Sequence, residues 1–247
     1  MAHKPNFIRK KKRKIHGDTF WDREYKNPEH LKLSHNPAED LVKFTRWLVR
    51  QKRSDLLDNS SQVLDVGCGN GRNLIYLSQN FGLPSTGIDI SSAALAQAKR
   101  LSINLPIKFF QHKAQNTLPA KDASQSLVLD MMTSHFLSGE ERQQLRDEIY
   151  RVLVPGGFLF MKTFLRDQDL HTKRLIKDFP GKENGTYIHP VMGVQEYVYS
   201  EKDLLEFLRE KFIIRKVYRS HKHIRKGKAY KRRTIVIYAE KDFDRIS

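Results

Sequence analysis

Short apolar runs alternate with longer segments of helical spacing through the middle of the chain. The β-type runs, which predict strands, are 62–66, 85–89, 107–111, 126–130 and 157–163. Apolar residues recur every three or four positions in the segments between them, and the helices predicted in this way are 71–80, 91–102 and 139–153. This alternation predicts an α/β fold whose parallel strands are joined by right-handed helical crossovers.

The C-terminal part departs from this alternation. After a helix predicted over 201–210, two β-type runs at 212–218 and 234–239 follow each other with no helix between them. Two such runs predict a hairpin. The loop that joins them, 219–233, has no apolar core of its own, so we expect it to bind a ligand rather than to fill space.

Composition and pattern together divide the chain into three parts. Residues 1–17 have the character of a basic flexible arm, and 18–57 form a helical extension before the α/β pattern. Residues 58–247 are expected to form one domain, large enough to bury a full core. Within this domain, 164–200 is an insertion after the fifth predicted strand and is expected to shape a substrate pocket.

Two helices are predicted in the extension. The first is short and carries Trp21 and Tyr25 on one side, a pattern that by itself indicates packing onto the domain. The second covers roughly 37–52, with Asn36 as its N-cap and Pro37 at its first helical position. Its apolar positions lie at helical spacing, which predicts that it packs against the domain.

A glycine-rich turn follows the first predicted strand. The turn runs from Asp65 to Asn73 with the sequence DVGCGNGRN, and the next strand ends in Asp89, where nucleotide-binding α/β folds hold a ribose. No Gly-Lys-Ser/Thr follows, which excludes the phosphate loop of nucleotide hydrolases. The glycine spacing also departs from the dinucleotide pattern G-x-G-x-x-G.

This motif, with Asp89 closing the next strand, closely resembles the S-adenosylmethionine (SAM) site of class I methyltransferases. The resemblance covers about 55–165 strongly and continues to 240, with a Pro-Gly-Gly turn before the fifth strand. It implies a seven-stranded, mostly parallel, doubly wound sheet whose last strand is antiparallel. In that family the loop packs on the methionine part of SAM, and the acid matching Asp89 holds both ribose hydroxyls. Many members also have an aromatic-acid segment before the fold that covers the SAM site, so the resemblance makes Trp21 and Tyr25 candidates for a cover. The predicted cofactor-binding residues are Asp65, Gly67, Cys68, Gly69, Asn70, Gly71, Asn73, Asp89, Ile90, Gln115, Asn116 and Asp130.

Two strand ends supply candidates for chemistry. Asp130 ends the fourth strand and Lys162 the fifth, a combination that resembles the ribose 2′-O-methyltransferases with their Lys-Asp-Lys-Glu tetrad. The last-strand position that should carry the Glu is Thr234, and Glu196 could substitute only if the insertion folds back. The glycine turn and the segment from Asp130 are also similar to tellurite-resistance-type and other small-acceptor methyltransferases. Asp130 and Lys162 are the predicted catalytic residues.

The net charge of +17 is concentrated in two segments. Residues 1–16 hold seven Lys or Arg and 211–233 hold eleven, with no acid in either; without them the chain has 27 basic and 28 acidic residues. Segments of this kind bind phosphates without reading sequence, so the predicted partner is a nucleic acid, RNA before DNA. In the family the loop 219–233 lies at the carboxyl edge of the sheet, beside the active site. The predicted substrate-binding residues are His135, His189, Lys222, Arg225, Lys226, Lys228, Lys231, Arg232 and Arg233.

Two alternatives stay open at this point. The chain could be a protein or small-molecule methyltransferase whose basic segments localise it, or a nucleic-acid-binding module without turnover. A single cysteine excludes an internal disulfide, and no metal site is expected from the histidine spacing. No apolar run of about eighteen residues exists, so we expect no membrane span and a cytoplasmic protein, nuclear or nucleolar in a eukaryote.

Overall fold

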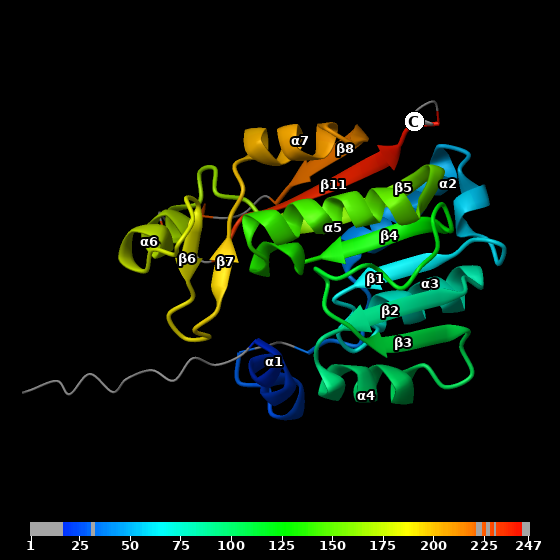
Figure 1. The fold of residues 1–247 in the computed structure, drawn as a ribbon, viewed down its shortest axis with the longest axis horizontal. Coiled ribbons are helices and arrows are strands. Elements are labelled where there is room, and N and C mark those ends of the chain that lie inside the picture. Colours follow the sequence, from blue (N-terminus) through cyan, green and yellow to red (C-terminus); the bar gives the residue numbers. More distant parts are fainter. Residues whose placement is uncertain (1–16, 31–32, 221–223, 226–227, 230, 244–247) are drawn as a thin grey trace, which may run out of the picture.

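The computed structural model describes residues 17–30, 33–220, 224–225, 228–229 and 231–243. Seven strands form one sheet in the order β3-β2-β1-β4-β5-β11-β8 (Figure 1). These strands are β1 Val63–Val66, β2 Ser85–Asp89, β3 Ile107–Gln111, β4 Gln125–Met131, β5 Leu153–Phe164, β8 Phe212–Arg219 and β11 Thr234–Lys241. Two short hairpins lie outside the sheet, β6 Thr186–Ile188 with β7 Gln195–Tyr197, and β9 Ile224–Arg225 with β10 Lys228–Ala229.

The strand directions confirm the predicted sheet. Strand β1 pairs in parallel with β2 and β4, and β4 pairs in parallel with β5. The last strand, β11, lies antiparallel between β5 and β8. Because β8 therefore runs with the parallel strands, the loop after Arg219 leaves at their carboxyl edge, as the sequence predicted.

Helices cover both faces of the sheet, as expected of a doubly wound fold. The α-helices are α1 Gly17–Lys26, α2 Glu39–Arg50, α3 Arg72–Phe81, α4 Ser92–Leu101, α5 Gly139–Val152, α6 Leu170–Asp178 and α7 Glu201–Arg209, and the 3₁₀ turns are η1 Ser54–Leu57 and η2 Ser134–Phe136. Apolar residues of α5 and α7 pack on one face, and those of α2, α3 and α4 pack on the other. The sheet is therefore buried on two sides, and its carboxyl edge is the place where polar side chains can gather.

The start of α2 differs from the prediction. The helix begins at Glu39 with Ala38 in the N-cap position, so Asn36 is not the cap. The backbone N–H of Ala38 instead donates to Asn73 Oδ1 of the glycine loop at 3.1 Å. A side chain 35 residues away thus satisfies this backbone group, which local sequence rules do not foresee.

The insertion 164–200 folds back over the carboxyl edge. It contains α6 and the β6–β7 hairpin, which lie beyond the arrowheads of the parallel strands in Figure 1. Helix α1 lies at the same edge, next to α4 (Figure 1). The carboxyl edge is therefore bordered by two segments that are not part of the α/β alternation.

Candidate functional site

Strand β1 ends in a loop of three glycines in the left-handed backbone region. Gly67, Gly69 and Gly71 have φ angles of +72°, +56° and +77°, and α3 begins at the next residue. A Cβ on Gly67 would lie 2.1 Å from Thr133 Oγ1, so only glycine lets this loop pack against the residues after β4.

Two carboxylates flank the glycine loop. Asp89 accepts hydrogen bonds from the backbone N–H groups of Gly69 at 2.9 Å and Ser91 at 2.8 Å. Asp65 is 1% exposed, and its Oδ2 has no hydrogen-bond partner among the residues that the structure describes. Burial, with the nearby carboxylates of Asp89 and Asp130, raises the pKa of Asp65 well above its ordinary value. The loop therefore borders a buried carboxylate, one oxygen of which receives no hydrogen bond from the described part of the chain.

Helix α1 is fixed to the start of α4. The Asp22 carboxylate accepts hydrogen bonds from the Ser91 hydroxyl at 2.7 Å and from the Ala93 N–H at 3.1 Å. The amide of Gln97 donates to the Tyr25 carbonyl at 2.5 Å. These contacts hold α1 beside the glycine loop rather than away from the domain.

Two aromatic side chains of α1 reach across the loop. The Tyr25 hydroxyl lies against Gly69, 2.2 Å from where a Cβ on that glycine would stand. Trp21 meets Phe136 of η2 edge to face, with 5.0 Å between ring centroids. The helix therefore spans from the glycine loop to the turn after β4, the place where a cover was expected.

Several of the other predicted cofactor residues make contacts within the protein. Asn73 accepts from Ala38 as described, and Asn70 Nδ2 donates to the Ser34 carbonyl at 3.1 Å, so both amides tie the segment before α2 to the loop. Burial raises the pKa of the Cys68 thiol well above its usual range, which leaves it neutral. The rest are Ile90 directly after β2, and half-buried Gln115 and exposed Asn116 in the turn after β3.

The predicted pairing of Asp130 with Lys162 is wrong. Strand β4 is in register with β5 so that Asp130 lies opposite Met161, and Met131 opposite Lys162. Side chains alternate between the faces of a sheet, which puts the two charged groups on opposite faces. Lys162 Nζ instead pairs with Asp40 of α2 at 2.6 Å. A lysine–carboxylate tetrad of the ribose-methylating kind is therefore not formed around these two residues.

Asp130 holds the turn after β4. It is 2% exposed, and its Oδ1 accepts a hydrogen bond from the Ser134 N–H at 3.1 Å. Burial raises the pKa of Asp130, and the bonds from Ser134 oppose that rise. The residue thus positions η2, which carries His135 and Phe136 at the carboxyl edge.

Comparison with known proteins identifies the domain. Residues 63–157 match the family model described as a methyltransferase domain. The fold superposes on the crystal structure of a SAM-dependent methyltransferase from Methanosarcina mazei with a TM-score of 0.65, at 26% identity over 77% of this chain and 96% of that one. Residues 63–157 are therefore a methyltransferase domain, and the fold is that of the class I SAM-dependent methyltransferases.

Curated relatives of this domain align over part of their length. An uncharacterized methyltransferase of Synechocystis is 33% identical over 39% of this chain and 43% of its own. A fatty-acid O-methyltransferase of Mycolicibacterium smegmatis is 26% identical over 65% of this chain and 58% of its own. The chain spans about half the length of the curated relatives it matches, so they establish the domain and leave the acceptor open.

The residues of the glycine loop fit SAM, the cofactor of this methyltransferase family. The three left-handed glycines leave backbone open where a Cβ would otherwise project. SAM carries an ammonium group and a ribose diol, which are hydrogen-bond donors, and the Oδ2 atom of Asp65 is a buried acceptor without a donor among the described residues. Asp65 and Asp89, together with the loop backbone, are the groups that would hold the cofactor.

A buried polar cluster joins the insertion to η2 and to the segment just before β11. Glu196 of β7 is 1% exposed and accepts hydrogen bonds from Arg232 Nη1 at 2.6 Å and from the Tyr187 hydroxyl at 2.5 Å. The Arg232 guanidinium lies 3.4 Å above the ring centroid of Phe164, and the His135 ring meets the same phenyl ring edge to face at 5.2 Å. We call these five residues the Arg232 cluster.

Two arginines of the predicted basic loop make hydrogen bonds within the protein. Arg232 is committed to the buried pair with Glu196, and Arg233 donates to the Asp167 carbonyl at 2.9 Å and to Gln168 Oε1 at 3.0 Å. These internal bonds occupy part of each guanidinium, and contact of the two arginines with phosphates stays a prediction. Of the other predicted substrate residues, Lys231 is exposed, Lys222 and Lys226 lie outside the described residues, and so do the side chains of Arg225 and Lys228.

His189 shapes the hairpin of the insertion. Its Nδ1 accepts from the backbone N–H groups of Val191 at 3.3 Å and Met192 at 3.2 Å, which closes the turn between β6 and β7. Burial lowers the pKa of His189, so its ring is neutral near pH 7. Contact with a substrate stays a prediction for this residue.

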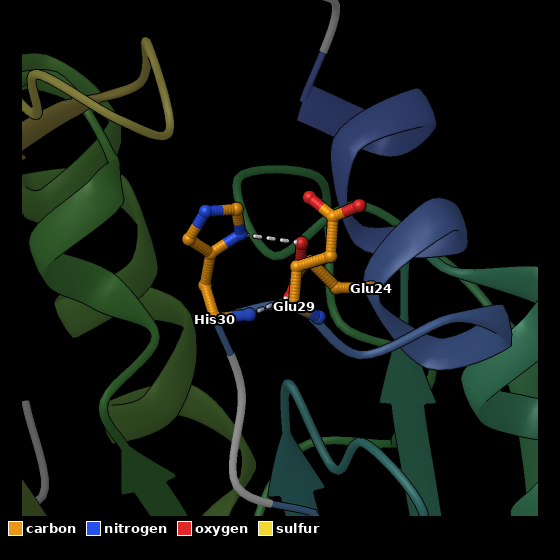
Figure 2. A group of neighbouring side chains, drawn as sticks. All are labelled: Glu24, Glu29 and His30. Atoms are coloured by element: carbon orange, nitrogen blue, oxygen red, sulfur yellow. Dashed lines mark hydrogen bonds and ion pairs between the residues drawn. The ribbon is translucent and has the colours of Figure 1, made fainter.

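One group of side chains in the described part of the chain has the composition of a metal site. Figure 2 shows it as Glu24, Glu29 and His30, at the end of α1. The Glu24 carboxylate already accepts from His30 Nδ1 at 2.7 Å and from the His30 backbone N–H at 2.8 Å. We therefore assign this group to fixing the turn after α1. A search of the described helices found none that is long and apolar enough to cross a membrane.

Proposed function

We propose that this methyltransferase transfers the methyl group of SAM to a small acceptor molecule. The observation that carries the proposal is the cover over the carboxyl edge, where α1 reaches from α4 to η2 through Asp22 and the Trp21–Phe136 contact. The β6–β7 hairpin borders the same edge (Figure 1). A site at this edge, bordered on two sides by α1 and the hairpin, suits a small acceptor better than a long polymer.

The residues of the chain would contribute mainly binding and alignment. SAM supplies an activated methyl group with a neutral leaving group, so correct placement of the acceptor accounts for much of the rate enhancement. Asp65 and Asp89 hold the donor, α1 limits the entry of water, and Asp130 fixes η2 beside the acceptor. The fatty-acid O-methyltransferase among the relatives supports an acceptor of this size.

A nucleic acid, RNA before DNA, is the second candidate acceptor. The charge distribution favours it, because eighteen of the 45 Lys and Arg residues lie in 1–16 and 211–233. Part of this charge is neutralised within the fold, as Arg232 shows. We therefore place the nucleic acid after the small acceptor.

Transfer of tritiated methyl groups tests both candidates. The protein is incubated with labelled SAM and, in parallel, with small-molecule, RNA, DNA and protein fractions of its host cells. We expect label in the small-molecule fraction; label in RNA with a steep salt dependence of binding would favour the second candidate.

Calorimetry of SAM binding is the companion measurement. Asp89→Ala should abolish binding, whereas Asp178→Ala, at an exposed position of α6, should not. Unchanged binding by Asp89→Ala would refute the cofactor site.

A further inference from the structure

The guanidinium of Arg232 is fixed in position before any ligand binds. Nη1 donates to Glu196 Oε2 at 2.6 Å, and the plane of the group stacks on the Phe164 ring at 3.4 Å. Glu196 is in turn held by the Tyr187 hydroxyl at 2.5 Å. Burial opposes ionisation of Glu196, but the charge of Arg232 and the hydrogen bonds from Tyr187 and Arg232 act together in the other direction. The pKa of Glu196 is lowered, so the pair is charged. The side chain of Arg232 keeps 14% exposure, which places it at the border of the carboxyl edge.

One edge of this guanidinium has no acceptor. Nε and Nη2 of Arg232 are buried and have no hydrogen-bond partner in the part of the chain that the structure describes. These two nitrogens form the edge along which arginine binds a carboxylate through two parallel N–H···O bonds. Leaving buried charged donors unpaired is costly, so a complementary oxyanion would be strongly favoured there.

His135 adds a second unpaired group at the same phenyl ring. It is 1% exposed, and neither ring nitrogen has a partner among the described residues. Its ring meets Phe164 edge to face at 5.2 Å, and it belongs to η2, the turn that Asp130 fixes. Phe136, the next residue, touches Trp21 of the cover. The side chains of Arg232 and His135, each with nitrogens that are unpaired among the described residues, thus contact the same Phe164 ring.

We infer that the acceptor is a carboxylate, which the Nε–Nη2 edge of Arg232 and the ring of His135 bind, and that the product is its methyl ester. This inference rests on the proposed function. A carboxylate matches the two-donor edge in shape, and it adds a single negative charge beside Glu196. A phosphate monoester would bring about −1.5 to −2 charges to the same place.

The chemistry balances without a base. One carboxylate oxygen forms the bond to the methyl carbon, the S–CH₃ bond breaks, and its electron pair stays on sulfur as a neutral thioether. A carboxylate is ionised at neutral pH, so no proton has to be moved, whereas a hydroxyl acceptor would need a general base. Neither of the two predicted catalytic residues is placed as a general base, because Lys162 is on the other face and the Asp130 carboxylate accepts a hydrogen bond from Ser134.

The test measures what kind of bond holds the transferred methyl. Host small-molecule extract is labelled with tritiated SAM, and the product is treated with dilute alkali, which releases volatile methanol from methyl esters and leaves ethers and methylamines intact. We expect most of the label to become volatile. Label that is stable to alkali overturns the inference and leaves the proposed function standing. A protein that binds SAM but labels no fraction overturns both.

Variants of the Arg232 cluster connect the activity to the residues. Arg232→Lys keeps the charge but removes the two-donor edge, and we expect kcat/KM to fall about 100-fold while the dissociation constant of SAM is unchanged. The matched control, Arg174→Lys on exposed α6, should keep full activity. Because Arg232→Lys could also disturb folding, the double variant Arg232→Met/Glu196→Gln removes both charges together and should bind SAM without transferring methyl. Ester formation by the double variant at the normal rate would refute the assignment.

Discussion

Replacing Gly69 by alanine tests whether α1 rests on the glycine loop. The added Cβ would lie 2.2 Å from the Tyr25 hydroxyl oxygen, a separation at which one of the two must move. The φ of +56° also carries a strain of about 1–2 kcal/mol for a residue with a side chain. The collision adds about 1–3 kcal/mol, the range of overpacked sites. Gly69→Ala should therefore lower the free energy of unfolding by about 2–5 kcal/mol.

A second substitution separates the two contributions. In Tyr25→Phe the oxygen is gone, and the nearest atom to the new Cβ is the ring carbon Cζ at 3.3 Å, which a small shift relieves. The cost of Gly69→Ala should then fall to the backbone strain of about 1–2 kcal/mol. Gly193→Ala is the matched control, since its φ is +71° and a Cβ there would meet nothing within 4 Å.

Urea unfolding of the four combinations of the two substitutions gives the coupling energy directly. We expect a coupling of about 1–3 kcal/mol, and faster hydrogen exchange in 17–26 for Gly69→Ala alone. If Gly69→Ala costs no more than Gly193→Ala, or if its cost is the same with and without the Tyr25 hydroxyl, α1 does not lie on the loop as described.

Three further predictions concern stability. Phe44→Ala should lower the free energy of unfolding in urea by about 3–5 kcal/mol, because this fully buried ring packs against Phe160 and Tyr238, whereas Val49→Ala on the exposed face of α2 should change it little. Burial lowers the pKa of His135 from 6.5 to about 4, so the unfolded chain binds a proton there between these values and the folded chain does not. The contribution of His135 to the free energy of unfolding should be complete above pH 6.5 and be lost as the pH falls toward 4, by on the order of 3 kcal/mol. Urea titrations at pH 4.5 and 7.5 measure this difference, which should be smaller in His135→Phe. Asp22→Ala should cost about 1 kcal/mol, as at a helix cap, and raise hydrogen exchange in α1; unchanged protection of α1 would count against its anchoring role.

The local pattern of apolar residues was sufficient to predict the strands of the sheet. Strands β2 and β3 were predicted with the bounds that the structure has, because each is a compact β-type run with clear turns on both sides. The glycine turn was recognised because residues in the left-handed backbone region are usually glycine. Its cofactor contacts stay predictions, carried by the family.

Features that depend on register or on distant partners could not be predicted. Asp130 and Lys162 both end strands, but one residue of register decides whether two side chains share a face. The N–H group of Ala38 is satisfied by Asn73, which no local rule connects to it. The Arg232 cluster was missed for the same reason, although the sequence did single out Glu196 as a residue that would matter if the insertion folded back.

The basic run 211–233 shows how charge along a sequence can overstate charge at a surface. Arg215 pairs with Glu240, Arg219 with Glu201 and Arg232 with Glu196. Acids from other segments therefore neutralise bases that are clustered in the sequence. A phosphate backbone would have to compete with these acids for the arginines. At Arg232 its competitor would be Glu196, which is buried. A single carboxylate avoids this competition, because it uses the edge of Arg232 that Glu196 leaves open. The same arginine that suggested a polymer in the sequence therefore supports a small anionic acceptor in the structure.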